Sequence, residues 1–118
     1  MAMSYRSQYT KAEKTAYMQS LRKTSGEMGV RFCVVYALKG NVQLCQLYAD
    51  RLNEISEVSA ADMDALNSDN SKVVRATLEK LLGSNAMEAF GGAALGRSEL
   101  YSLAKGVKST FTKGAYTR

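Results

Sequence analysis

Residues 28–39 read MGVRFCVVYALK, and the fold depends on whether this apolar stretch forms a strand or a helix. Val30, Phe32 and Val34 occupy alternate positions, as residues on one face of a strand do. The spacing of Val30, Val34 and Leu38 fits one face of a helix equally well. For a run this short, periodicity alone leaves both structures open.

The residues after this stretch favour the helix. An apolar stripe at helical spacing follows along residues 42–58, formed by Leu44, Cys45, Tyr48, Leu52 and Ile55. We therefore predict two helices joined by a turn, with Gly40 at the C′ position of the first helix. The alternative is a β-hairpin over residues 30–46, whose strands would meet across a turn at residues 39–41.

The rest of the chain carries repeated signals for the start and end of helices. Thr10 and Glu13 form a capping box ahead of apolar residues at helical spacing. Further helices are predicted at 59–67, 72–82, 84–90 and 98–108, with Ser59, Ser71, Ser84 and Ser98 as their N-caps. The chain contains no Pro, a residue that breaks helix interiors. We therefore predict an all-α fold, a compact bundle of five to six short helices.

The length of the chain places these helices in one domain. The chain has 118 residues, and single domains usually run to roughly 100–150 residues. We expect a flexible N-terminus at residues 1–9, a single helical domain at residues 10–108 and a basic flexible tail at residues 109–118.

The composition excludes several classes of enzyme. The chain has no His, so it cannot form a Ser-His-Asp triad, a Cys-His dyad or a His-ligated zinc site. Cys33 and Cys45 are too few for a four-cysteine metal site, and we expect both to be reduced thiols. Glu54, Glu57 and Glu79 show no pattern typical of an acid–base pair. We therefore predict a non-enzymatic protein with no cofactor.

Two patterns resemble ligand sites but fail in their context. Residues 91–98 read GGAALGRS, which is the spacing of a phosphate-binding loop with Arg97 in place of its Lys. Such a loop follows a strand, whereas residues 85–90 read as helix, so we interpret the glycines as a helix connection. The polar residues from Asp62 to Asn70 lack the ligand spacing of an EF-hand, and we assign them to helix capping and solubility.

Long apolar runs are missing from the sequence. Residues 1–6 read MAMSYR, which does not resemble a signal peptide. No window holds the roughly 18 apolar residues that cross a bilayer. We therefore expect a cytoplasmic protein with no membrane partner, located in the bacterial host cytoplasm if the chain is phage-encoded.

The charge of the chain, formally +5, is unevenly distributed. Residues 1–40 carry seven basic and two acidic side chains, residues 41–100 five and nine, and residues 101–118 four and none. Clustered cations at the two ends make nucleic-acid binding an alternative function. Its candidate residues are Arg22, Lys23, Lys105, Lys108 and Lys113. A helix-turn-helix interpretation of residues 60–82, with residues 72–82 as the recognition helix, belongs to this alternative.

The terminal helices carry apolar stripes that we expect a monomer of this size to leave partly uncovered. The candidate protein-binding residues in these stripes are Tyr17, Leu21, Leu100, Leu103 and Val107. The basic ends around an acidic middle would also let copies approach with opposite potentials facing each other. We therefore expect self-association or binding to a protein partner.

One part of the chain resembles a known family. Residues 69–92 read DNSKVVRATLEKLLGSNAMEAFGG, and residues 97–107 read RSELYSLAKGV. Over residues 70–108 this order of helix, break, short helix, glycine-bearing loop and closing helix resembles the small tail assembly chaperone-like proteins of long-tailed bacteriophages. The resemblance implies a helical, non-enzymatic protein that binds a tape-measure or tail-tube protein during assembly. A small phage- or plasmid-encoded inhibitor or regulator of a host nucleic-acid machine, or a structural subunit of the virion, is the competing interpretation.

Overall fold

The computed structural model describes residues 28–112, and every regular element in that part of the chain is a helix. The elements are α3 (Met28–Ala37), α4 (Val42–Glu54), α5 (Ala60–Leu66), α6 (Ser71–Leu82), α7 (Ser84–Phe90), the 3-10 helix η1 (Gly92–Ala94) and α8 (Arg97–Phe111). The predicted all-α bundle is therefore confirmed, and the alternative of a β-hairpin over residues 30–46 is wrong. The expected flexible N-terminus at residues 1–9 and the helix beginning at Thr10 lie outside the described residues.

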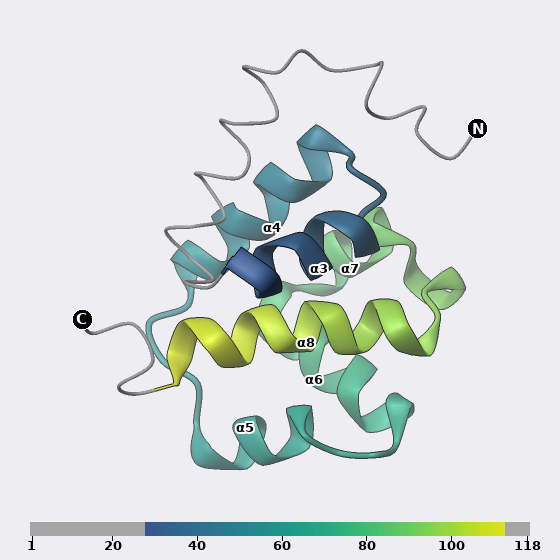
Figure 1. Cartoon of the computed structure of the whole chain (residues 1–118). Helices are drawn as coiled ribbons and strands as arrows, with labels where there is room; N and C mark the ends of the chain where they lie inside the picture. The colour runs from purple at the N-terminus through teal and green to yellow at the C-terminus, as the bar shows by residue number, and fades with distance from the viewer. Residues whose placement is uncertain (1–27, 113–118) are drawn as a thin grey trace.

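The last helix runs through the middle of the bundle (Figure 1). α3 packs along one side of α8, and α5 and α6 pack on its other side. α4 and α7 pack on each other and on α6. This arrangement leaves α8 covered on two sides, while α3 lies at the outside of the bundle.

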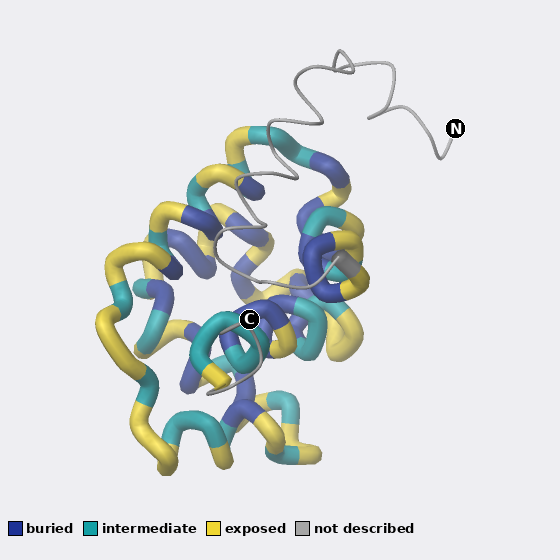
Figure 2. Tube along the Cα trace, turned by 60° about the vertical axis from the view of Figure 1, so that its left-hand side comes forward, coloured by how far each residue is buried: buried dark blue, intermediate teal, exposed yellow. Residues whose placement is uncertain are grey.

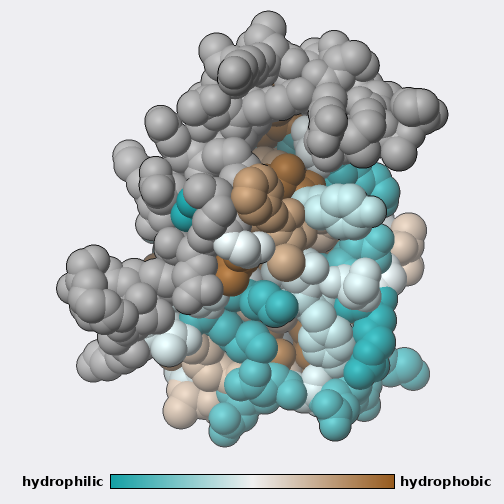
Figure 3. All heavy atoms as spheres, viewed as in Figure 1, coloured by the Kyte–Doolittle hydropathy of each residue, from teal (hydrophilic) through white to brown (hydrophobic). Residues whose placement is uncertain are grey.

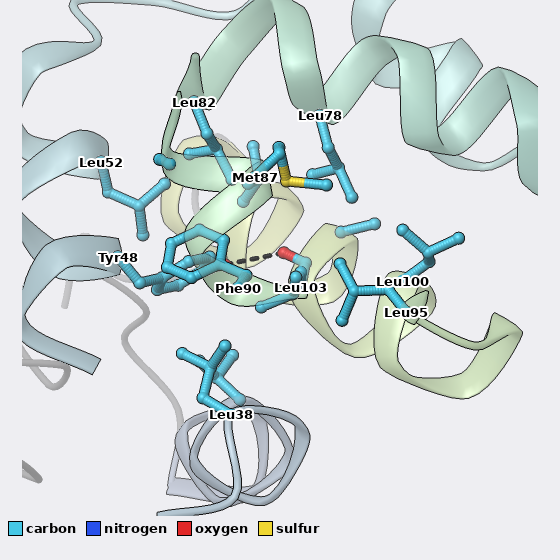
Figure 4. Packing of buried hydrophobic residues seen from close by; sticks show 14 of the residues in the cluster. Leu38, Tyr48, Leu52, Leu78, Leu82, Met87, Phe90, Leu95, Leu100 and Leu103 are labelled. Carbon is cyan, nitrogen blue, oxygen red and sulfur yellow. Dashed lines mark hydrogen bonds between the residues drawn. The ribbon is translucent and has the colours of Figure 1, made fainter. Parts of the chain in front are cut away.

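The core is made where the apolar faces of these helices meet. Figure 2 shows buried positions recurring along every helix, separated by exposed ones, as amphipathic helices require. Large side chains with 2% exposure or less fill the centre (Figure 4), among them Leu38, Tyr48, Leu52, Leu78, Leu82, Met87, Leu100 and Leu103. The rings of Tyr48 and Phe90 meet edge to face, with their centroids 6.1 Å apart.

A tight turn ends α3 at Ala37 and leads into α4. Lys39 and Gly40 both have positive φ, at 59° and 67°. The amide of Gly40 donates to the carbonyl of Val35 (2.8 Å), and the amide of Lys39 donates to that of Tyr36 (3.0 Å). This is a Schellman motif, in which the C′ residue is Lys39 and not the predicted Gly40, which stands one position later.

The helix caps follow the predicted boundaries with small shifts. Ser59 caps α5 as predicted, since its hydroxyl accepts from the amide of Asp62 at 3.1 Å. Asn70, not Ser71, caps α6, because its side-chain oxygen accepts from the amide of Lys72 at 2.9 Å. The helix therefore begins one residue earlier than predicted.

The two later N-caps also differ from the prediction. Gly83, with φ of 96°, both ends α6 and leads directly into α7, so Ser84 is already helical. Gly96 stands at the N-cap of α8 in place of Ser98. The amide of Gly96 donates to the Glu99 carboxylate at 2.8 Å, which supplies one half of a capping box.

Two helix ends differ from the sequence prediction. α4 ends at Glu54, with Ile55 as an extended C-cap residue, whereas the apolar stripe predicted a helix as far as residue 58. α8 continues through Phe111, three residues beyond the predicted boundary at 108. Residues 109–111 are therefore part of the bundle and not of the expected flexible tail; residues 113–118 lie outside the described part.

Candidate protein-binding surface

An exposed pair of aromatic side chains lies on the outer side of α3. Phe32 is 57% exposed and Tyr36 is 80% exposed, and the two are one helical turn apart. Gly29 is also exposed and Cys33 is half-buried on the same side of the helix. We refer to Gly29, Phe32, Cys33 and Tyr36 as the aromatic face of α3.

The opposite side of α3 anchors the helix in the core. Val30, Val34 and Leu38 are buried there, with at most 6% of each residue exposed.

Apolar side chains gather over α3 in the space-filling view (Figure 3). Across residues 29–112, Val73 on α6 is the other large apolar residue with substantial exposure, at 38%. The aromatic face is therefore where exposed aromatic groups occur together in the described part of the chain.

Phe32 and Tyr36 were absent from the residues proposed from sequence, although a signal for them existed. The sequence places both in the alternating pattern of a strand, in which they would share one face with Val30 and Val34. In a helix the same two residues point away from the face formed by Val30, Val34 and Leu38. The helix predicted for this stretch therefore already implied that both rings lie on its outer side.

The predicted protein-binding residues on α8 are core residues. Leu100, Leu103 and Val107 have 1%, 0% and 0% of their surface exposed. Because α3 covers one side of α8 and α5 and α6 cover the other, the apolar stripe of this helix is already packed within one chain. These three residues therefore offer no exposed surface to a partner. The other two candidates, Tyr17 and Leu21, lie outside the described residues.

The predicted nucleic-acid-binding residues are brought together only in part. Lys105 is exposed on α8, and Lys108, one turn later, donates to the side-chain oxygen of Asn67 at 2.7 Å. Partial burial and the neighbouring charge of Lys105 lower the pKa of Lys108. The remaining candidates, Arg22, Lys23 and Lys113, lie outside the described residues.

The predicted recognition helix presents few unengaged cations. On α6, Arg75 donates to the carbonyl oxygens of Gly92 (2.5 Å) and Leu95 (3.1 Å). Lys80 donates to the carboxylate of Asp62 on α5 at 3.0 Å. Residues 28–112 as a whole carry nine basic and nine acidic side chains, so the excess positive charge of the chain lies at residues 1–27 and 113–118.

The glycine-rich loop is a helix connection held by Arg75. Residues 84–90 form α7, so a helix precedes the loop where a phosphate-binding loop needs a strand. Arg97, at the position of the phosphate-binding Lys, lies 4.8 Å from the centre of the Tyr101 ring in a cation–π contact.

The polar residues around α5 serve the fold. Asp62 pairs with Lys80, Asn67 accepts from Lys108 and Asn70 caps α6. Among residues 28–112, no three His, Cys, Asp or Glu side chains are grouped closely enough to hold a metal ion. In the same part of the chain, no helix has the length and apolar character needed to cross a bilayer.

An open groove lies where α4, α6 and α7 meet. It has a volume of about 470 Å³ and is lined by side chains that include Arg51, Ile55, Lys80 and Leu81. Arg51 is paired with Glu54 at 2.9 Å at its edge. Two charged side chains of its lining, Glu54 and Lys80, are engaged in ion pairs with Arg51 and Asp62.

No protein-family model, curated protein or solved structure matches this chain.

Proposed function

We propose that this chain is a non-enzymatic protein-binding module and that it docks its partner on the aromatic face of α3. The exposure of Phe32 and Tyr36 on one side of one helix is the observation that carries the proposal. Aromatic residues are enriched among those that dominate the energy of protein interfaces. An apolar helix or strand of a partner laid along α3 would bury both rings.

The resemblance of residues 70–108 to tail assembly chaperone-like proteins gives the proposal a more specific form. In that form the partner is a tape-measure or tail-tube protein, held in a binding-competent state before assembly. A chaperone of apolar helices requires an apolar docking surface and no catalytic group. The aromatic face would provide that surface, and α8, which lies within the segment that carries the resemblance, packs against α3.

The proposal is tested by recovering the partner with matched variants. The full chain, its Tyr36→Asp variant and a Val73→Asp control would be used to capture proteins from phage-infected cells, followed by mass spectrometry. Val73→Asp places the same charge at an exposed apolar position on α6. We expect phage tail proteins with the wild type and with Val73→Asp, and their loss with Tyr36→Asp.

Other outcomes would contradict this proposal. A partner that Tyr36→Asp retains in full would remove α3 as the docking surface. Recovery of a host polymerase or nuclease, or retention on nucleic acid that falls steeply with salt, would favour the regulator of a nucleic-acid machine.

A further inference from the structure

We propose that the aromatic face is self-complementary, and that two copies of this chain cover it by packing α3 against α3 in an antiparallel pair. This inference rests on the proposed function, because it uses the same face and names its occupant when no other partner is bound. At concentrations where this dimer forms, a partner must displace the second copy before it can dock.

The four residues of the aromatic face form one continuous stripe. With 3.6 residues per turn, Tyr36 lies roughly 20° around the helix from Gly29. Phe32 lies roughly 60° to one side of Gly29, and Cys33 roughly 40° to the other. All four therefore lie within an arc of roughly 100°, which is the usual width of a helix face that packs on another element.

The order of large and small residues in the stripe fits a two-fold axis between positions 32 and 33. Such an axis relates antiparallel copies and places Tyr36 of each copy over Gly29 of the other. It also brings Phe32 against Phe32 of the second copy on one side of the contact, and Cys33 against Cys33 on the other. A Cβ built on Gly29 has no atom within 4 Å, so the space for the incoming Tyr36 ring is open.

The exposed area predicts a weak dimer. An aromatic side chain buries about 150–250 Å² when fully covered. From the exposed fractions of Phe32 and Tyr36, four rings would contribute roughly 400–700 Å² to the interface. Stable interfaces bury about 1,200–2,000 Å² in total, so we expect association only at high protein concentration.

The net charge of the chain predicts how dimer formation depends on salt concentration. None of the four residues in the stripe is charged, and residues 28–112 carry equal numbers of basic and acidic side chains. The whole chain carries +5, so two copies repel each other at low salt. Because salt screens this repulsion, association through α3 should strengthen as salt is added. An association driven by opposite charges on the ends and the middle of the chain would weaken instead.

Sedimentation equilibrium of the full chain, from low micromolar to near-millimolar concentration, tests the proposal. We expect a mass that rises toward that of a dimer, more so at high salt. Tyr36→Asp and Gly29→Leu should each weaken the dimer by roughly tenfold or more. Gly29→Leu fills the space for the Tyr36 ring, while the open surroundings of Gly29 leave the monomer unstrained. Val73→Asp on α6 is the control and should leave the dimer unchanged.

Disulfide cross-linking tests the position of the axis. At helix separations of about 8–10 Å, with Cα atoms about 2.3 Å from each helix axis, the two Cys33 Cα atoms would lie roughly 5–6.5 Å apart. This separation is within the range of about 4.4–6.8 Å that a disulfide accepts. Diamide, which takes up the two electrons and two protons released by the thiols, should link two copies through Cys33. Cys33→Ser should abolish the linked dimer, and Cys45→Ser should not, because Cys45 is buried.

Three outcomes would overturn the proposal. The first is a strict monomer at every concentration and salt tested. The second is a dimer that both Tyr36→Asp and Gly29→Leu leave intact, and the third is a dimer that weakens with salt. Failure here is distinguishable from failure of the proposed function. If the protein is a monomer but still captures a partner in a Tyr36-dependent way, the proposed docking surface stands and only the proposed dimer is wrong.

Discussion

The hydroxyl oxygen of Tyr48 occupies the space that a side chain at Gly106 would need. It donates a hydrogen bond to the carbonyl oxygen of Leu103, 2.7 Å away (Figure 4). A Cβ built on Gly106 would overlap this oxygen and would lie 3.0 Å from Cγ2 of Val34. Side chains of α3 and α4 therefore meet α8 at one point, and the absence of a side chain there allows the contact.

We expect Gly106→Ala to destabilise the protein by about 1–3 kcal/mol, because the added methyl displaces a buried ring. In an exposed helix interior the same change stabilises by about 1 kcal/mol. The measurement is urea unfolding followed by circular dichroism. The matched control is Gly29→Ala, where nothing lies within 4 Å of the new Cβ, and it should not destabilise the monomer.

A double-mutant cycle identifies the cause of this destabilisation. Tyr48→Phe removes the oxygen that the new methyl group would meet, so Tyr48→Phe and Gly106→Ala together should cost less than the sum of their separate effects. Strict additivity, or a Gly106→Ala variant as stable as the wild type, would contradict the packing of Tyr48 on Gly106.

Stability should fall at alkaline pH because of two buried groups on α4. Burial raises the pKa of the Cys45 thiol from 9.0 to about 12, and it also raises the pKa of the Tyr48 phenol. Above pH 9.0 the unfolded chain releases a proton that the folded state keeps, so the free energy of unfolding decreases as pH rises. Each group should contribute a slope of up to about 1.4 kcal/mol per pH unit.

The matched variant for this pH dependence is Cys45→Ala. It removes one of the two groups, so its free energy of unfolding should fall less steeply with pH above 9.0 than that of the wild type. The two slopes are compared and not the absolute stabilities, because the smaller side chain lowers stability at every pH. Equal slopes would mean that Cys45 ionises in the folded protein as readily as in the unfolded chain.

Local sequence signals predicted many of the buried residues, but not the contacts between residues that are distant in the sequence. The apolar stripe on residues 42–58 placed Tyr48 and Leu52 inside, and both are buried. The need for Gly106 could not be predicted, because it depends on a ring that is distant in the sequence. N-caps were predicted to within two residues, since they depend on neighbouring amides. The shift to Asn70 came from an equivalent capping side chain next to Ser71, and the shift to Gly96 from the Glu99 carboxylate, which accepts from the Gly96 amide.

The two hydrogen bonds of Arg75 should hold the connection between α7 and α8. Arg75→Ala leaves the carbonyls of Gly92 and Leu95 without this partner, and we expect a loss of about 1–3 kcal/mol. Amide exchange of Ala94 and Leu95, which close the 3-10 turn, should quicken. Lys72→Ala, an exposed cation on the same helix, is the control and should change stability by about 0.5 kcal/mol or less. Equal effects of the two variants would contradict a structural role for Arg75.

The contacts of Arg75 could not be predicted from the sequence, because charge alone does not show which carbonyls a side chain will reach. A docking surface was predicted at Leu100, Leu103 and Val107, since an apolar stripe looks the same whether its own chain or a partner covers it. The packing of α3, α5 and α6 on α8 shows that the chain itself covers this stripe, and the contact of α3 with α8 joins segments at opposite ends of the described chain.

The two cysteines should react at very different rates in the native protein. Cys33 is half-buried on the aromatic face, whereas Cys45 is 2% exposed and its raised pKa keeps the thiol protonated at neutral pH. Because the thiolate is the reactive form, we expect a small maleimide to label Cys33 first. Cys45 should react only through opening of the core. Labelling followed by peptide mass spectrometry measures both rates.

Labelling of Cys45 then reports the stability of the core directly. When opening limits reaction and reclosing is fast, its rate follows the population of the open state. A destabilisation of about 1.4 kcal/mol should raise that rate about tenfold. Gly106→Ala should therefore accelerate labelling of Cys45 while leaving that of Cys33 nearly unchanged, and Lys72→Ala should alter neither. Native labelling of Cys45 as fast as that of Cys33 would show that α4 is not packed as described.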